Sequence, residues 1–275
     1  MSEQAEAPVG SSRSFIELRG LHKRFGSNSV LRGVDLSIAP GEIFSILGGS
    51  GSGKSVMLKH MAGLLRPDAG QVLVEGRDVT AFTERQWVAV RTRVGYVFQG
   101  AALFDSLSAY ENVAYPLREH MRNWGEQQLR ERVESSLEAV GLAGEERRMP
   151  AELSGGMRKR LGVARAIALE PDAILYDEPT TGLDPANARR IGQLICELRQ
   201  RLQVTSVVVT HEMDLCFAIS DRIVLLKGGR IVATGTPEEI RGSSQTDVRE
   251  FLEGGYDSMR ELPRNAREEG EPNGR

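Results

Sequence analysis

The stretch that decides the fold is GGSGSGKS, at residues 48–55. It fits the pattern G-x-x-x-x-G-K-[ST] and lies between a short apolar run at residues 42–47 and a helical stretch at residues 56–65. Glycines let backbone N–H groups turn toward an anion, because no Cβ stands in the way. A glycine-rich turn without a ligand is the alternative, but the flanking elements favour a phosphate-binding loop at a helix N-terminus. The residues predicted to contact the phosphates are Gly48, Gly49, Ser50, Gly51, Ser52, Gly53, Lys54, Ser55 and Val56.

A second motif supplies acidic groups that suit the same chemistry. Lys54 is expected to place its charge on the β and γ phosphates of a nucleotide, and the Ser55 hydroxyl is expected to bind Mg2+. The apolar run at residues 173–176 ends in Asp177 and Glu178. Asp177 is suited to hold Mg2+, and Glu178 could orient and deprotonate a water aimed at the γ-phosphate. A solvated acidic turn is the alternative, and the upstream loop favours the catalytic interpretation.

Two further polar residues follow predicted strands. Gln99 comes after VGYVF and His211 comes after SVVVT. An amide can contact Mg2+ and the attacking water, and an imidazole can touch the γ-phosphate, so each could sense that phosphate. Taken singly, each is better interpreted as a strand-end turn residue. Their functional prediction therefore depends on the phosphate loop.

The order of the expected elements indicates an α/β fold. Strand-like patterns at residues 15–18 and 31–38 favour an early antiparallel β layer. Residues 100–160 have a helical pattern instead, and strands then alternate with helices across residues 173–226. Such alternation implies a parallel sheet with helices on both faces.

Three regions are expected along the chain. Residues 1–13 are polar and rich in small side chains, which predicts a disordered tail. Residues 14–240 are expected to form the nucleotide-binding domain, with residues 100–160 as its helical part. Residues 241–275 are expected to be partly disordered, with a short docking helix near residues 247–253.

Composition narrows the class of protein. The chain is 40% hydrophobic and 27% charged with a formal net charge of −3, which is typical of a globular protein and argues against a nucleic-acid partner. The two cysteines, Cys196 and Cys216, are too few for a disulfide framework and indicate a reducing compartment. No run approaches the roughly 18 apolar residues of a membrane helix. We therefore expect a cytosolic chain that does not itself cross a bilayer.

Six motifs, in this order, resemble those of the nucleotide-binding subunit of an ATP-binding-cassette (ABC) transporter, over residues 15–239. They are the phosphate loop, the glutamine loop at Gln99, the signature LSGGM at residues 153–157, the acidic pair Asp177 and Glu178, the aspartate loop Gly182-Leu183-Asp184, and the switch histidine His211. The resemblance implies a P-loop NTPase fold with a RecA-like parallel sheet core, an antiparallel β layer and a helical subdomain. It also implies hydrolysis of ATP with Mg2+, in which Ser55, Gln99 and Asp177 bind the metal.

The resemblance gives a role to a second helix N-terminus. The subunits of this family dimerise head to tail, and the signature of one chain faces the γ-phosphate held by the other. Ser154, Gly155, Gly156 and Met157 are therefore expected to bind a nucleotide in trans, which accounts for the absence of an acid there. Met157 stands where the commonest family pattern has glutamine. Phe25 lies where the family places an aromatic ring against adenine, with a core aromatic as the alternative.

A narrower resemblance concerns the kind of transporter. GAALFDSLS at residues 100–108, the run at residues 110–120, LSGGMRKR and LYDEPTTGLDP are similar to the ATPase of the MCE-type (Mla) phospholipid transport system. This resemblance implies an integral membrane permease, an MCE-type lipid-binding partner, and a position at the cytoplasmic face of the inner membrane. The tail DVREFLEGG resembles the segment of that group that reaches the partner ATPase.

Several alternatives remain open at this point. The ATPase could serve another system, such as amino-acid import, lipoprotein release or division-site signalling. A P-loop metabolite kinase would share the loop, but it would need an acceptor pocket in place of the signature and Glu178. For Arg158, Lys159 and Arg160, a solvated basic helix face is preferred over phosphate binding.

Overall fold

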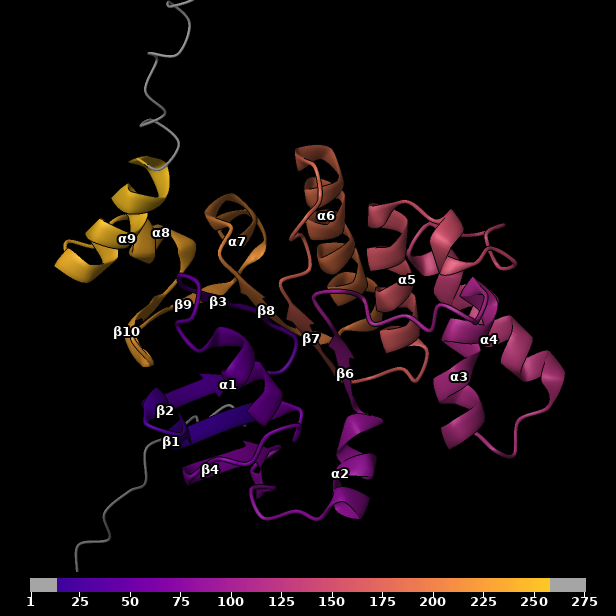
Figure 1. Ribbon diagram of the computed structural model, residues 1–275, viewed down its shortest axis with the longest axis horizontal. Coiled ribbons are helices and arrows are strands. Elements are labelled where there is room, and N and C mark those ends of the chain that lie inside the picture. Colours follow the sequence, from indigo (N-terminus) through magenta and orange to yellow (C-terminus); the bar gives the residue numbers. More distant parts are fainter. Residues whose placement is uncertain (1–13, 258–275) are drawn as a thin grey trace, which may run out of the picture.

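The computed structural model describes residues 14–257 (Figure 1). The predicted tail at residues 1–13 and the last part of the chain, residues 258–275, lie outside the described residues. Within the described part, two sheets and several helices form layers around three buried apolar clusters. No helix within residues 14–257 is both long and apolar enough to cross a membrane.

The central sheet has six strands in the order β10-β9-β3-β8-β7-β6. All neighbouring pairs are parallel except β10 and β9, as the sequence predicts for its alternating part. Strands such as IFSIL are buried along their whole length, which is typical of a parallel sheet covered on both faces. The strands are β3 (Ile43–Leu47), β6 (Val94–Val97), β7 (Ala173–Asp177), β8 (Thr205–Thr210), β9 (Arg222–Lys227) and β10 (Arg230–Gly235).

A four-stranded antiparallel sheet covers one face of this core. Its order is β2-β1-β4-β5, which confirms the predicted antiparallel layer. Helix α1 lies between the two sheets, where Met57, Leu58 and Met61 are fully buried (Figure 1). The elements of this side are β1 (Ile16–Phe25), β2 (Asn28–Ile38), α1 (Lys54–Met61), β4 (Ala69–Val74), β5 (Arg77–Asp78) and α2 (Glu84–Arg91).

Helices cover the opposite face. Successive residues of a strand point to opposite faces, so Leu175 of β7 joins the core around α1 while Ile174 and Tyr176 join a second core beneath the helices. The helical pattern predicted for residues 100–160 corresponds to α3 and α4 and to the first part of α5, which continues to Ile167. The helices of this face are α3 (Ala109–His120), α4 (Glu126–Ala139), α5 (Gly155–Ile167), α6 (Pro185–Leu202) and α7 (Met213–Ile219).

The C-terminal elements pack on the chain itself. After α8 (Pro237–Arg241), α9 (Thr246–Asp257) includes the helix predicted near residues 247–253. Val248 is fully buried in a third apolar cluster, and Lys227 on β9 forms ion pairs with Asp247 and Glu250. The apolar side of α9 is therefore used within the same chain.

Candidate active site

The sequence-predicted polar residues meet at one edge of the central sheet. The phosphate loop follows β3, Gln99 comes shortly after β6, Glu178 follows β7, and His211 follows β8. These strands are parallel, so their carboxyl ends share one edge. Topology alone thus brings together residues that are far apart in the sequence.

The phosphate loop has the backbone of an anion nest. Gly51 and Gly53 have φ values of 74° and 107°, in the left-handed region that glycine adopts without strain. A Cβ at Gly48 would lie 2.5 Å from the Leu226 carbonyl oxygen, so that glycine is required by close packing. The Ser52 hydroxyl is buried and has no hydrogen-bond partner among the described residues. A cradle of this shape, with an unsatisfied polar atom inside it, suits a phosphate group.

The Lys54 side chain folds back over the start of the phosphate loop. Its Nζ donates to the carbonyl oxygens of Gly48 at 2.8 Å and Gly49 at 3.0 Å, and it is 3.5 Å from Glu178 Oε1. The Lys54 and Glu178 side chains are only 6% and 10% exposed. Buried charges of opposite sign attract each other more strongly in a medium of low dielectric than in water. The structure therefore places the predicted cation and the predicted base next to each other.

Asp177 is held by two hydroxyl groups. Ser55 Oγ donates to Asp177 Oδ1 at 2.6 Å, and Tyr96 Oη donates to Asp177 Oδ2 at 2.9 Å. Burial, and next the Asp177 charge, raise the pKa of Tyr96, so this phenol stays protonated as a donor. Sequence reasoning missed Tyr96, although its place on β6, beside the acidic strand, is a usable signal.

The Ser55 hydroxyl and the Asp177 carboxylate supply oxygen atoms suited to a magnesium ion. No cluster of three His, Cys, Asp or Glu side chains that could bind a metal exists within the described part of the chain. Magnesium in nucleotide sites takes only one or two protein ligands and completes its octahedron with phosphate oxygens and water. The adjacent Ser55 hydroxyl and Asp177 carboxylate match that requirement. The Gln99 side chain is exposed at the end of its strand, on the same sheet edge.

Glu178 is fixed on both carboxylate oxygens. Its Oε2 accepts from His211 Nδ1 at 2.8 Å and from Thr181 Oγ1 at 3.1 Å, while Oε1 faces Lys54. The residue has a φ of 49°, which is strained for a side chain with a Cβ. A carboxylate held in a strained backbone by three partners is preorganised to act as a base toward a water molecule.

The prediction for the basic run after the signature was partly wrong. A solvated basic face was preferred for Arg158, Lys159 and Arg160, but Lys159 and Arg160 are each only 8% exposed. The interpretation fails because α5 turns Lys159 toward the sheet edge and Arg160 toward Arg190 of α6, whereas Arg158 stays exposed. Lys159 Nζ donates to the main-chain oxygens of Gln99 and Glu178, the latter at 3.3 Å. Burial lowers the pKa of Lys159, and the nearby carboxylates, Glu178 first, oppose this effect.

The signature residues lie at the N-terminus of α5, away from the phosphate loop. Ser154 caps the helix by accepting from the Met157 N–H at 3.2 Å. Gly155 is exposed, and a Cβ at Gly156 would lie 2.8 Å from Asn187 Oδ1. Among the described residues, no hydrogen bond joins residues 154–157 to the phosphate loop. The α5 side chains pack into the core on the face of the sheet opposite to α1.

Asp184 and Phe25 also lie at the surface. Asp184 caps α6 by accepting from the N–H groups of Ala186 and Asn187, both at 3.0 Å. The Phe25 ring is 48% exposed at the end of β1, with Lys23 Nζ 5.6 Å from its centroid. The alternative of a core aromatic at Phe25 is therefore wrong, and the ring is free to stack on a ligand.

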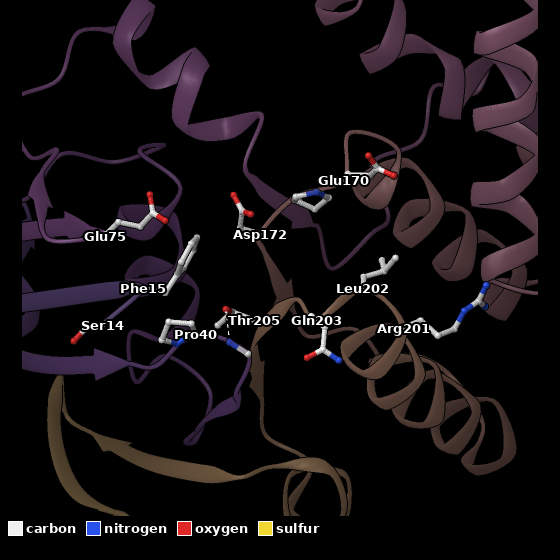
Figure 2. A pocket seen from close by; sticks show the side chains of 12 residues that line it. Ser14, Phe15, Pro40, Glu75, Glu170, Asp172, Arg201, Leu202, Gln203 and Thr205 are labelled. Atoms are coloured by element: carbon white, nitrogen blue, oxygen red, sulfur yellow. Dashed lines mark hydrogen bonds between the residues drawn. The ribbon is translucent and has the colours of Figure 1, made fainter. Parts of the chain in front are cut away.

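A cavity of about 730 Å³ lies at the opposite edge of the central sheet (Figure 2). Pro40 precedes β3, Asp172 precedes β7 and Thr205 begins β8, so the cavity faces the amino ends of these strands. Arg93 bridges Glu75 and Asp172, which satisfies these carboxylates within the chain. The cavity contains none of the predicted phosphate-binding residues.

Comparisons with known proteins agree with this geometry. The sequence matches the family model described as "ABC transporter" over residues 31–181. It is 42% identical over 239 residues to a probable ribonucleotide transport ATP-binding protein (mkl) of Mycobacterium leprae, covering 87% of this chain and 69% of that protein. It is 39% identical over 246 residues to the intermembrane phospholipid transport system ATP-binding protein MlaF of Haemophilus influenzae, covering 90% of this chain and 93% of that protein.

Two further similarities complete the comparison. A methionine import ATP-binding protein (MetN) of Leifsonia xyli is 42% identical over 234 residues, covering 84% of this chain and 68% of that protein. Among solved structures, the dimeric post-hydrolysis state of the ATP-binding cassette MJ0796, bound to ADP and Pi, has a TM-score of 0.75 and 33% identity, covering 81% of this chain and 98% of that one.

The fold and the site define a P-loop ATPase that hydrolyses ATP, because a phosphate nest, a paired lysine and an oriented carboxylate occupy one edge of its parallel sheet. The chain belongs to the ABC transporter family.

Proposed function

We propose that this chain is the ATP-hydrolysing subunit of a transporter that moves phospholipid through a separate membrane permease. We further propose that it works as a head-to-tail dimer. One observation supports the dimer. Helices α1 and α5 both have N-termini suited to phosphate, and they pack on opposite faces of the central sheet. Lys54, Ser55 and Glu178 lie at the start of α1, whereas the start of α5 is exposed at Ser154 and Gly155. A second chain would bring the two together.

The proposal assigns a role to each residue of the site. Lys54, the loop N–H groups and the Ser154–Gly156 donors of the other chain stabilise charge on the γ-phosphoryl group. Glu178 accepts a proton from the attacking water, and His211 holds the carboxylate in place. Ser55 and Asp177, with the Gln99 amide nearby, would hold a Mg2+ ion, which when bound would supply positive charge to the phosphates. Phe25 stacks on the adenine and Asp184 supports the neighbouring chain's site.

An exposed aromatic pair supports docking of a permease. The rings of Phe104 and Tyr115 lie 4.8 Å apart by their centroids, and the two residues are 41% and 46% exposed. Arg165, which donates to the Ala101 and Ala102 carbonyl oxygens, lies 5.9 Å from the Phe104 ring centroid, so a permease helix pressed there would lie beside the glutamine loop. Paired exposed aromatics are typical of interface anchors. The permease would hold the ATPase at the cytoplasmic face of the inner membrane.

The lipid cargo is supported by relatives. MlaF of H. influenzae is matched over 93% of its length, and an MCE-type lipid-binding protein is the further partner expected for such a system. The similarity to mkl and MetN favours ribonucleotide or methionine transport as the second candidate. Phospholipid is preferred because the run at residues 100–120, beside the expected permease contact, resembles that of the lipid transport group.

Complementation tests the dimer. Lys54→Ala removes the phosphate-loop cation and Ser154→Arg blocks the signature, so each variant alone should be inactive. Co-expression with two affinity tags yields a heterodimer in which one of the two composite sites is intact. We expect ATP turnover up to about half that of the wild type, as symmetry of a two-site dimer requires. A heterodimer no more active than its parents would contradict the head-to-tail arrangement.

The cargo is tested separately. The full chain is purified with its membrane partner, reconstituted into vesicles, and assayed for ATP-dependent transfer of a fluorescent phospholipid to acceptor vesicles. Glu178→Gln serves as the control, because it should stop transfer without preventing assembly. Stimulation of ATP hydrolysis by methionine or a ribonucleotide, with no lipid transfer, would replace the lipid proposal by the second candidate.

A further inference from the structure

The glutamine loop, residues 99–102, has an unusual backbone. Ala101 and Ala102 have φ values of 61° and 47°, so two consecutive residues with a Cβ are in the left-handed region. Only glycine adopts this region readily, and other residues remain there when surrounding structure holds them. Ala101 is 2% exposed, while Ala102 is exposed. Something other than local preference therefore fixes the conformation of this loop.

One face of α5 supplies the contacts that fix it. Arg165 donates from Nη2 to the Ala101 carbonyl oxygen at 2.8 Å and from Nη1 to the Ala102 carbonyl oxygen at 2.7 Å. One turn earlier, Gly162 leaves room for the loop, since a Cβ there would lie 3.2 Å from Ala101 Cβ. Lys159, a further turn toward the signature, donates to the Gln99 carbonyl oxygen. Residues spaced by three along a helix share one face, so α5 contacts the loop along its length.

Lys159 also joins this loop to the backbone of Glu178. The same Nζ donates to the main-chain oxygen of Glu178 at 3.3 Å. Glu178 is itself in a left-handed conformation, with φ of 49°. Two α5 cations, the buried Lys159 and the half-buried Arg165, thus donate to the carbonyl groups of three left-handed residues, Ala101, Ala102 and Glu178.

We propose that Lys159 and Arg165 are positioning residues that hold the glutamine loop and Glu178 in these conformations. These contacts connect the backbone of Gln99 and Glu178 to the signature helix. The proposal deepens the ATPase function that the family membership gives. One extension rests on the proposed permease function: the Arg165 guanidinium is 5.9 Å from the centroid of Phe104, so the docking surface contacts the same arginine.

A double-mutant cycle tests the role of Arg165. In Arg165→Met the loop loses both guanidinium hydrogen bonds, and we expect kcat to fall by about tenfold at saturating Mg-ATP, because small misplacements of reacting groups cost that much or more. The dissociation constant for ATP should change by less than about twofold. Adding Ala102→Gly should recover most of the loss, since glycine adopts the left-handed conformation without help. Ala102→Gly alone should stay within about twofold of the wild type.

The thermal midpoint of each variant separates positioning from folding. A merely structural role for Arg165 would lower kcat in proportion to the folded fraction, and Ala102→Gly would not restore it. The proposal is overturned if Arg165→Met turns over ATP like the wild type. It is also overturned if Ala102→Gly fails to rescue a variant whose thermal midpoint is normal.

A second variant tests Lys159 independently. Lys159→Met removes both carbonyl contacts and should lower kcat by about tenfold to a hundredfold with ATP binding retained. Lys159→Arg keeps a cationic N–H donor of at least equal reach and should restore part of kcat. Equal activity in the two variants would overturn the proposal. The Arg165 and Lys159 variants are both assayed by ATP hydrolysis of the full chain. Failure of lipid transfer would therefore contradict the proposed cargo without affecting the proposed role of these two residues.

Discussion

Two helix N-termini in this chain look alike and differ in their surroundings. Both α1 and α5 begin at a glycine-rich turn, and neither has an acidic residue in its first turn. The N-cap of α1 is Gly53, which makes no side-chain cap hydrogen bond, whereas the α5 N-cap is Ser154, which accepts from Met157. A helix start without a carboxylate favours an anion in both cases.

The difference lies in what stands beside each start. Lys54, Ser55 and Glu178 surround the beginning of α1 within hydrogen-bonding or ion-pair range. The beginning of α5 is exposed at Ser154 and Gly155, and the nearest side chain to a Cβ at Gly155 is Leu183, at 3.7 Å. Thus charged and hydroxyl side chains lie together at the start of α1, whereas the proposed phosphate contact at the start of α5 depends on a second chain.

The largest effect is expected at α1. Glu178→Gln removes the base while keeping the size of the side chain, and kcat should fall by about a thousandfold, as for loss of a preorganised catalytic group. ATP binding should remain, because the phosphate loop is unchanged. Turnover with Mg-ATP and equilibrium nucleotide binding measure the two effects. Glu134→Gln, an exposed position on α4, is the matched control and should behave like the wild type.

A smaller but distinct effect is expected at α5. Ser154→Arg should lower kcat by about a hundredfold, since a bulky side chain excludes the partner's phosphate from this helix start. Binding of ATP to the isolated chain should be unaffected, in contrast to Lys54→Met, which should weaken both. If Ser154→Arg also weakened ATP binding by the isolated chain, the two helix starts would serve one nucleotide in the same chain.

Two neighbouring glycines at the start of α5 allow ligand approach to be distinguished from packing within the chain. Gly155→Ala meets no close contact within the chain, so its thermal midpoint should be unchanged while kcat falls by about tenfold because a partner's nucleotide approaches the backbone there. Gly156→Ala places a Cβ 2.8 Å from Asn187 Oδ1 and should destabilise the fold by about 1–2 kcal/mol. Normal turnover in Gly155→Ala would show that no ligand comes close to this start.

Much of the fold could be predicted because strong local signals agree with it. The glycine pattern of residues 48–55 and the buried runs before Asp177 and His211 establish a parallel sheet. Missed strands such as β5 (Arg77–Asp78) and β10 (Arg230–Gly235) lie at the edges of their sheets. Their pairing with neighbouring strands, rather than their own composition, makes them strands.

Site residues that belong to a sequence motif could be predicted. Site residues that packing alone brings to the site could not. Asp177 and Glu178 are recognisable from their strand, but Tyr96 enters the site only because β6 lies beside β7. Lys159 was misassigned because a run of basic residues usually marks a solvated face. Its burial depends on the path of the glutamine loop across α5, which no local pattern encodes.

The smallest effect concerns the far end of α1. His60 is fully buried, its Nδ1 is 2.7 Å from the Val56 carbonyl oxygen, and its Nε2 has no partner among the described residues. Burial lowers the pKa of His60 below its ordinary value of 6.5. As the pH falls through about 6.5, the unfolded chain takes up a proton that the folded chain excludes, so stability is lost on the acid side.

We expect the thermal midpoint of the wild type to fall by about 2 °C between pH 8 and pH 5.5 on account of His60, as a change of roughly 1 kcal/mol would give. His60→Leu should flatten this dependence, because an apolar side chain binds no proton. His120→Leu, at an exposed position on α3, should retain the wild-type slope. Equal slopes in all three proteins would mean that the folded chain accepts a charge beside Val56, and that the end of α1 is more open to water than its packing indicates.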